Sequence, residues 1–191
     1  MKKLGILLML LGLLLVSGAG ALVLHNGGED LEAGTASAQL LTEVSDRLAE
    51  PGERPGEIRT EMTVKDVDGR PCIGVLSIPA IDRELPVLAD WSYPELRVAP
   101  CRYVGSTFTD NLVIAAHNYR RHFGHIGQLR PGDDVYFTDM DGLTTAYSVL
   151  DTETLMGTDV EGMVESDADL SLFTCTYGGR SRITVRCERV H

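Results

Sequence analysis

Between about Met62 and the C-terminus, the chain consists of short apolar runs separated by turn residues, and this pattern limits the fold most. Many runs are rich in β-branched or aromatic residues, and few amphipathic segments of helix length lie between them. Such spacing is typical of all-β proteins, so we predict a barrel or a sandwich, with a helical turn at Tyr93–Val98. The runs expected to form strands are Ile73–Ile78, Glu84–Leu88, Leu112–Ala116, Asp134–Thr138, Thr145–Leu150, Leu170–Cys175 and Ile183–Val190.

The run from Arg182 to Val190 shows the alternation of a strand most clearly. Ile183, Val185 and Cys187 share one face, which we expect to point to the core, because side chains alternate between the two faces of a strand. Arg182 and every second residue after it share the opposite face. Arg182 therefore projects away from the core where this strand begins.

Cys175 ends the preceding run, Leu170–Cys175. If the two runs pair through a hairpin at Thr176–Ser181, Cys175 and Arg182 lie opposite each other. A thiolate is a strong nucleophile, and a nearby cation favours its ionisation and can hold a developing oxyanion. We therefore predict Cys175 as a nucleophile and Arg182 as the group that holds the oxyanion.

His117 closes the apolar run Leu112–Ala116, which makes it a candidate acid or base at a strand end. Asn118 follows it and is expected to orient the loop or a substrate carbonyl, with ordinary surface polarity as the equal alternative. His122 and His125 lie close by, but no carboxylate or cysteine stands at ligand spacing. Two neighbouring arginines would also repel a bound cation. We therefore expect no metal site.

The composition narrows the class of function. The 191 residues carry a formal net charge of −11, so nucleic-acid binding, which needs a basic face, is not expected. Gly178-Gly179 lacks the Lys-Ser/Thr that completes a phosphate-binding loop, so it is interpreted as a hairpin turn. We expect no cofactor.

The run Leu4–Leu24 contains 21 residues without a charge, which is long enough to span a bilayer as a helix. Lys2 and Lys3 precede it and acidic residues follow it, so the positive-inside rule places the N-terminus in the cytoplasm. A cleaved signal peptide is the alternative, since Gly18–Ala21 is small enough for a cleavage site. The run is long for a signal sequence, so we favour an uncleaved anchor.

The domain division follows from these segments. We predict a cytoplasmic stub at residues 1–3, a transmembrane anchor at 4–24, a linker with a short helix at 25–61, and the catalytic domain at 62–191. The linker begins as a polar connector at His25–Thr35, a helix is expected at Ser37–Glu50, and Pro51–Glu57 is a second linker. The protein is therefore expected in the cell membrane with a single pass and its catalytic domain outside.

Besides Cys175, the chain has Cys72, Cys101 and Cys187, each in or beside an apolar run. Buried free thiols are one interpretation. Because the domain is exported, a Cys101–Cys187 or a Cys72–Cys187 disulfide is the other. The sequence leaves this choice open.

Five segments together resemble the sortases, the cysteine transpeptidases of Gram-positive cell surfaces. Leu170–Cys175 is similar to the family's Thr-Leu-x-Thr-Cys signature, with serine in place of the first threonine. Arg182–Val185 resembles the family's arginine strand, and Val113–His117 resembles its histidine strand, with alanine in place of the usual glycine before the histidine. The segments Gly74–Ile81 and Leu85–Val87 resemble the family's opening pair of strands.

The resemblance covers roughly Ile73 to Val190 and implies an eight-stranded β-barrel without a cofactor. It implies that Cys175 attacks a C-terminal sorting signal of an exported protein, that His117 protonates the leaving amine, and that Arg182 holds the oxyanion and the substrate. An amine then displaces the acyl group. The residues expected to contact the sorting signal are Thr174, Asn118 and Tyr177.

Within the family, the segments around His117 and Cys175 look most like class B. Class B members usually carry a long helix before the cysteine strand, whereas Asp151–Asp169 is short and acidic here. The lid motif of pilin-polymerising members and the calcium-binding glutamates of class A are not recognised in this chain. The sorting motif and the amine acceptor, a cell-wall peptide or a pilin lysine, therefore stay open.

Two other functions are compatible with parts of the pattern. A papain-like cysteine hydrolase would need a histidine downstream of the nucleophile, and His191 is the only histidine after Cys175 in the sequence. A non-catalytic surface binding module with a structural disulfide is the other alternative.

Overall fold

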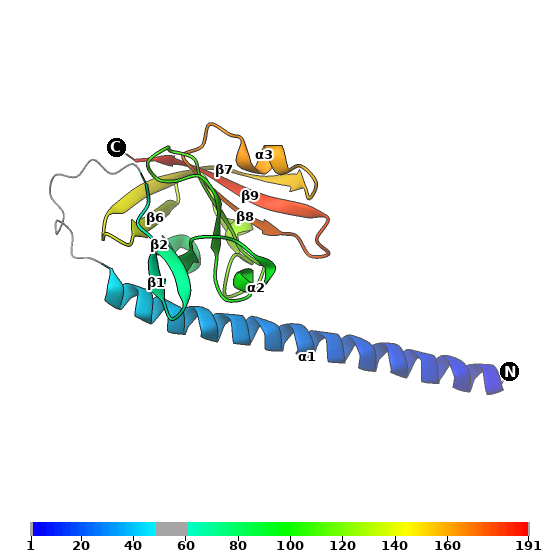
Figure 1. Ribbon diagram of the computed structural model, residues 1–191. Helices are drawn as coiled ribbons and strands as arrows, with labels where there is room; N and C mark the ends of the chain where they lie inside the picture. The colour runs from blue at the N-terminus through cyan, green and yellow to red at the C-terminus, as the bar shows by residue number, and fades with distance from the viewer. Residues whose placement is uncertain (1, 49–60, 191) are drawn as a thin grey trace, which may run out of the picture. The chain divides into compact units, whose positions relative to one another are not determined.

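The computed structural model describes residues 2–48 and 61–190, and the chain divides into two compact units after Glu32. The second unit, from Ala33, contains one sheet of nine strands (Figure 1). The strands are β1 (Lys65–Val67), β2 (Arg70–Ile78), β3 (Arg83–Leu88), β4 (Cys101–Val104), β5 (Leu112–Ala115), β6 (Asp134–Asp139), β7 (Thr144–Met156), β8 (Leu170–Cys175) and β9 (Ser181–Arg189). The helical elements are α1 (Lys2–Arg47), α2 (Tyr93–Leu96) and α3 (Val160–Val164), with 3-10 turns at Pro79–Ile81 and Ile126–Gln128.

Eight of these strands form a closed barrel. Their order is β2-β3-β4-β5-β8-β9-β7-β6, and β6 pairs with β2 to complete the ring. Strand β1 lies outside the ring and forms a hairpin with β2. The predicted all-β fold with eight strands is confirmed. The pattern analysis missed the two short strands β1 and β4, which have three and four residues.

Closure of the barrel depends on a close approach at Gly74 in β2. This strand pairs with both β3 and β6, and its register with β3 shifts between Cys72 and Gly74. A Cβ atom at Gly74 would lie 2.1 Å from the backbone oxygen of Thr138 in β6. Only glycine therefore lets the two strands approach at this point.

Two apolar clusters stabilise the unit, one on each face of the sheet. The inner cluster fills the barrel, and its fully buried members include Ile73, Phe123, Phe137 and Tyr147. The outer cluster lies between the sheet and the helices. It contains Leu40 and Val44 of α1, Leu96 of α2, Met163 of α3 and Phe173 of β8.

Helix α1 is longer than the sequence pattern predicts. In place of the polar connector at His25–Thr35 and a separate helix from Ser37, one helix runs from Lys2 to Arg47. The connector contains glycines but no proline, and a nucleated helix gains one hydrogen bond for each residue that it adds. Glu50 and the second predicted linker, Pro51–Glu57, lie outside the described residues.

The C-terminal part of α1 belongs to the folded unit, although the sequence pattern assigned it to a linker. Ala33, Ser37, Leu40 and Val44 are buried, and they recur at the spacing of one helix face. The described fold therefore includes residues from Ala33 onward, whereas the predicted catalytic domain begins at residue 62. The N-terminal part of α1 is long and apolar enough to cross a membrane.

Candidate active site

Strands β8 and β9 bring Cys175 and Arg182 together. The strands are antiparallel, and Cys175 is the register partner of Arg182. The intervening turn contains Gly178 and Gly179, whose φ angles of 88° and 72° suit glycine and strain other residues. This arrangement confirms the hairpin and the opposition of the two residues that the sequence predicts.

His117 reaches the same place through a different pairing. Strand β5 is parallel to β8, with Ala115 as the register partner of Phe173, and the amide of Ala116 donates to the Phe173 carbonyl at 3.2 Å. Because parallel strands end at the same edge of a sheet, His117 emerges beside the end of β8. This juxtaposition joins residues 58 positions apart and depends on the tertiary fold.

Cys175, His117 and Arg182 line one pocket of about 190 Å³. The pocket lies on the outer side of the barrel, because Phe173, which shares a strand face with Cys175, belongs to the outer cluster. Helices α2 and α3 contribute to its walls. The other lining residues are Trp91, Tyr93, Leu96, Tyr103, Ala115, Ala116, Gly157, Val160, Met163, Phe173 and Thr174.

Burial separates Cys175 from the other three cysteines. All four are free thiols, but Cys72, Cys101 and Cys187 are fully buried and Cys175 is half-buried in the pocket wall. Burial is the main cause that raises the pKa of the Cys72 thiol to about 11 and those of Cys101 and Cys187 to about 12. These three thiols stay protonated at neutral pH, so Cys175 is the cysteine suited to act as a nucleophile.

The backbone of the hairpin orients Arg182. Its Nη1 donates to the carbonyls of Gly179 at 2.9 Å and Ser181 at 3.1 Å. A guanidinium carries five N–H donors in a planar fork, so bonds at one nitrogen restrict the direction of the others. The arginine is thus held next to Cys175 by its own turn.

Gly157, which follows β7, is a site residue that the sequence analysis missed. Its amide donates to the Arg180 carbonyl at 2.9 Å. A Cβ atom there would lie 3.0 Å from that carbonyl and 3.1 Å from Arg182 Nη1. The absence of a side chain gives the guanidinium its space. Nothing in the local sequence signals this, because the contact joins segments that lie more than twenty residues apart in the chain.

Aromatic side chains form one wall of the pocket, and they were also missed. Tyr103 stacks on Trp91 with ring centroids 5.3 Å apart and meets Phe173 edge-on at 5.2 Å. Trp91 in turn meets Tyr93 at 5.9 Å. The single tryptophan, two residues from a tyrosine, could have marked a binding surface, but its stacking with β4 could not be foreseen.

The three residues expected to contact substrate occupy different environments. Thr174 lines the pocket but is 2% exposed, and its hydroxyl donates to the Ala116 carbonyl at 2.8 Å. Asn118 is half-buried and Tyr177 is 89% exposed, and neither lines the pocket. The structure brings Thr174 to the site, whereas Asn118 and Tyr177 lie outside the pocket lining.

His122 and His125 lie apart from this pocket lining. His122 is fully buried and packs edge-on against Tyr119, with ring centroids 5.5 Å apart. Within residues 2–48 and 61–190, no three His, Cys, Asp or Glu side chains are grouped so that they could hold a metal ion.

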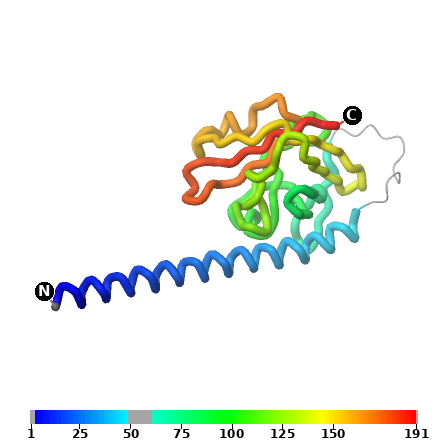
Figure 2. Tube along the Cα trace, turned by 180° about the vertical axis from the view of Figure 1, so that it is seen from behind, coloured from blue at the N-terminus to red at the C-terminus, as the bar shows by residue number. Residues whose placement is uncertain are grey.

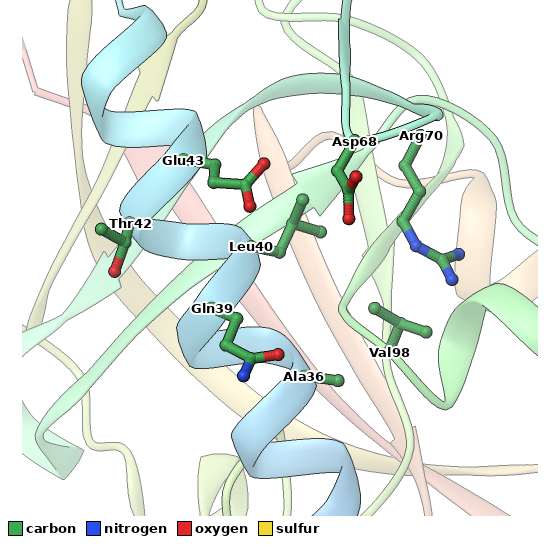
Figure 3. A pocket seen from close by; sticks show the side chains of 8 residues that line it. All are labelled: Ala36, Gln39, Leu40, Thr42, Glu43, Asp68, Arg70 and Val98. Atoms are coloured by element: carbon green, nitrogen blue, oxygen red, sulfur yellow. The ribbon is translucent and has the colours of Figure 1, made fainter.

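A second hollow of about 570 Å³ lies between α1 and the β1–β2 turn (Figure 3). It contains both acidic and basic side chains, including Glu43, Asp68 and Arg70. Arg70 also pairs with Glu95. None of the cysteines or histidines in the described ranges lines this hollow, so the pocket at Cys175 is the candidate active site.

Comparison with protein families identifies the class of enzyme. The family model described as the sortase domain matches residues 76–190, which is more than half of the chain. The chain therefore belongs to the sortase family, whose members are cysteine transpeptidase-type enzymes. A search of curated proteins found no match.

Solved sortase structures share the fold. Sortase C1 from Streptococcus suis is 28% identical, with a TM-score of 0.55 over 63% of this chain and 73% of that chain. Sortase C from Streptococcus pneumoniae is 23% identical, with a TM-score of 0.55 over 86% of this chain and 89% of the other. The sortase D5 transpeptidase of Clostridium perfringens is 17% identical, with a TM-score of 0.64 over 82% of this chain and 99% of the other. These relatives are named as sortases of classes C and D, and the resemblance to class B stays a prediction.

Proposed function

We propose that this protein is a membrane-anchored sortase that cleaves a C-terminal sorting signal and transfers the acyl group to an amine. The observation that carries the proposal is the meeting of Cys175, His117 and Arg182 around one pocket. The three side chains come from β8, the end of β5 and β9, and they supply a nucleophile, an acid/base and a cation. Acyl transfer requires these three roles at one carbonyl group.

In the proposed reaction, the Cys175 thiolate attacks the carbonyl carbon of the scissile peptide bond. The resulting oxyanion accepts hydrogen bonds from the Arg182 guanidinium, which stays charged throughout. His117, as imidazolium, gives a proton to the leaving amine, and the C–N bond breaks to leave a thioester on Cys175. The incoming amine then loses a proton to His117, attacks the thioester and releases the thiolate.

The substrate is proposed from the family and from the pocket. Sorting signals are peptides, and the aromatic and aliphatic wall around Trp91, Tyr103 and Met163 suits apolar side chains near the scissile bond. The sortase C of Streptococcus pneumoniae is described in terms of its pilin substrate specificity. We propose that the acceptor here is either a cell-wall peptide or a pilin lysine.

The N-terminal helix is proposed to anchor the enzyme. The apolar stretch of helix α1 is long enough to cross a membrane, and its side chains are not buried within the structure. We propose a single pass with the N-terminus in the cytoplasm and the catalytic unit outside. Protease added to intact cells should digest the barrel, whereas an N-terminal tag should be digested only after lysis.

The experiment that tests the activity uses the full chain in detergent micelles. A panel of sorting pentapeptides is incubated with and without an added amine, and the products are identified by mass spectrometry. Transfer to the amine, together with an acyl adduct on Cys175, supports the proposal. Equal hydrolysis with and without the amine would favour a cysteine hydrolase, and transfer by a Cys175→Ala variant would refute the assigned nucleophile.

A further inference from the structure

A buried arginine on the outer face of β9 lies outside the lining of the catalytic pocket. Arg186 shares its strand face with Arg182, and the sequence pattern would leave both in solvent. In the structure, Arg186 is 7% exposed. The ribbon in Figure 1 and the tube in Figure 2 both show the α3 segment beside β7 and β9, and Arg186 contacts this segment through its hydrogen bonds.

The guanidinium of Arg186 joins three structural elements. Its Nε donates to Glu153 Oε1 of β7 at 2.8 Å, and its Nη1 donates to Ser171 Oγ of β8 at 2.8 Å. Nη1 also donates to Ser166 Oγ at 3.3 Å, just after α3. A buried charge that is paired and hydrogen-bonded in this way fixes the relative positions of its partners.

The same guanidinium holds the end of α3. Its Nη1 donates to the Met163 carbonyl at 3.2 Å, and its Nη2 donates to the Gly162 carbonyl. The last carbonyls of a helix have no partner within the helix, and they carry the negative end of its dipole. Arg186 therefore satisfies the C-terminal end of a five-residue helix that its own hydrogen bonds would hold only weakly.

Helix α3 is also a wall of the catalytic pocket. Val160 and Met163 line the pocket with Cys175, and Met163 packs in the outer cluster with Phe173. Met163 thus contributes its side chain to the pocket and its carbonyl to Arg186. A shift of the guanidinium would move the substrate-facing wall without touching the reacting groups.

We propose that Arg186 is a positioning residue that locks α3 in place as the substrate-binding wall, and so controls peptide binding more than the chemical step. This inference rests on the proposed transpeptidase function. An arginine suits the task because its planar fork reaches acceptors on β7, β8 and α3 at once, whereas a lysine offers a single nitrogen.

The test measures kcat and KM for a transferred sorting peptide with the full chain in micelles. We expect Arg186→Lys to raise KM about tenfold while kcat changes less than about twofold, because only binding to the wall is weakened. The matched control is Arg189→Lys on the same strand, since Arg189 pairs with Asp110 and bonds the Thr107 carbonyl. The control should leave KM unchanged.

A merely structural role would give a different result. It would lower the fraction of enzyme that a thiol-reactive inhibitor titrates, with KM of the remaining enzyme unchanged, and that outcome would overturn the proposal. Coupling provides a second criterion. As a single substitution, Met163→Ala should raise KM. In the Arg186→Lys background it should add little to KM, because both changes act through the same wall. Additive effects on KM would also contradict it.

Hydrogen exchange separates this inference from the proposed function. Amides of residues 162–166 should exchange faster in Arg186→Lys and in Ser171→Ala than in the wild type, and should be unchanged in Arg189→Lys. If the wild type transfers no peptide, the transpeptidase proposal fails, and this exchange still decides whether Arg186 holds α3. Unchanged exchange in both variants refutes the positioning role.

Discussion

Thr174→Val tests whether the threonine beside Cys175 serves the fold or the substrate. The hydroxyl of Thr174 donates to the Ala116 carbonyl at 2.8 Å and so ties β8 to the residue before His117. Valine keeps the size and the branched shape but removes the donor. The Ala116 carbonyl is then left buried without this partner, because Ala116 is 6% exposed.

The magnitude follows from that single bond. A neutral hydrogen bond contributes about 1 kcal/mol net, and an unsatisfied buried partner raises the cost to about 1–3 kcal/mol. For a unit of this size, the midpoint of thermal unfolding should fall by roughly 3–10 °C. Because the bond also sets the spacing of Cys175 and His117, we expect kcat to fall about tenfold, with a smaller change in KM.

Thr184→Val is the matched control on the neighbouring strand. Thr184 is fully buried and is the register partner of Phe173, but its hydroxyl has no hydrogen-bond partner among the described residues. Replacing it should leave the thermal midpoint unchanged or raise it, with kcat unaffected. The reasoning is refuted if the two variants unfold at the same temperature, or if Thr174→Val changes KM alone, which would indicate a substrate contact.

Two further predictions concern the same site, and a third concerns the buried cysteines. Arg182→Gln should lower kcat about 10²-fold or more in the peptide transfer assay, because it removes the charged donor for the oxyanion, and a loss under tenfold would contradict that role. Gly157→Ala should lower kcat with little change in KM, since its Cβ would lie 3.1 Å from Arg182 Nη1; a Thr158→Ala variant, which adds no atom near the guanidinium, serves as control. The three buried thiols should make the free energy of unfolding fall between about pH 9 and 12, because burial raises their pKa to about 11 and 12 in the folded state, so the unfolded state loses these protons first. Urea titrations across that range should show a smaller decline that begins near pH 10 when the three buried cysteines are replaced by alanine, because burial also raises the pKa of Tyr147 from 10 to about 12.

Local sequence patterns sufficed for the parts of the site that are close along the chain. The boundaries of β8, Leu170–Cys175, match the predicted run, and Cys175 faces Arg182 because the six residues between them include two glycines and allow a tight antiparallel turn. Alternation also identified the core-facing residues of β9, since Val185 and Cys187 lie in the inner cluster. These features depend on chain geometry over fewer than twenty residues.

Other features could not be read from such patterns. The alternation on β9 left the opposite face to solvent, whereas α3 covers it, and Arg186 is buried there with five hydrogen-bond acceptors. The polar segment at His25–Thr35 is helical because nothing in it stops a helix, and the buried face from Ala33 to Val44 depends on the barrel that it contacts.

The sequence by itself determined the class of fold, the opposition of Cys175 and Arg182 and, through its motifs, the family. Those properties follow from residue types and short spacings, which set strand alternation, turn geometry and thiol chemistry. Only the tertiary structure decided that His117 joins them, through the parallel pairing of β5 with β8, and that Gly157, Trp91 and Met163 shape the pocket. Such contacts join distant segments, and the free energy that selects them comes from packing of the whole barrel, which no local pattern records.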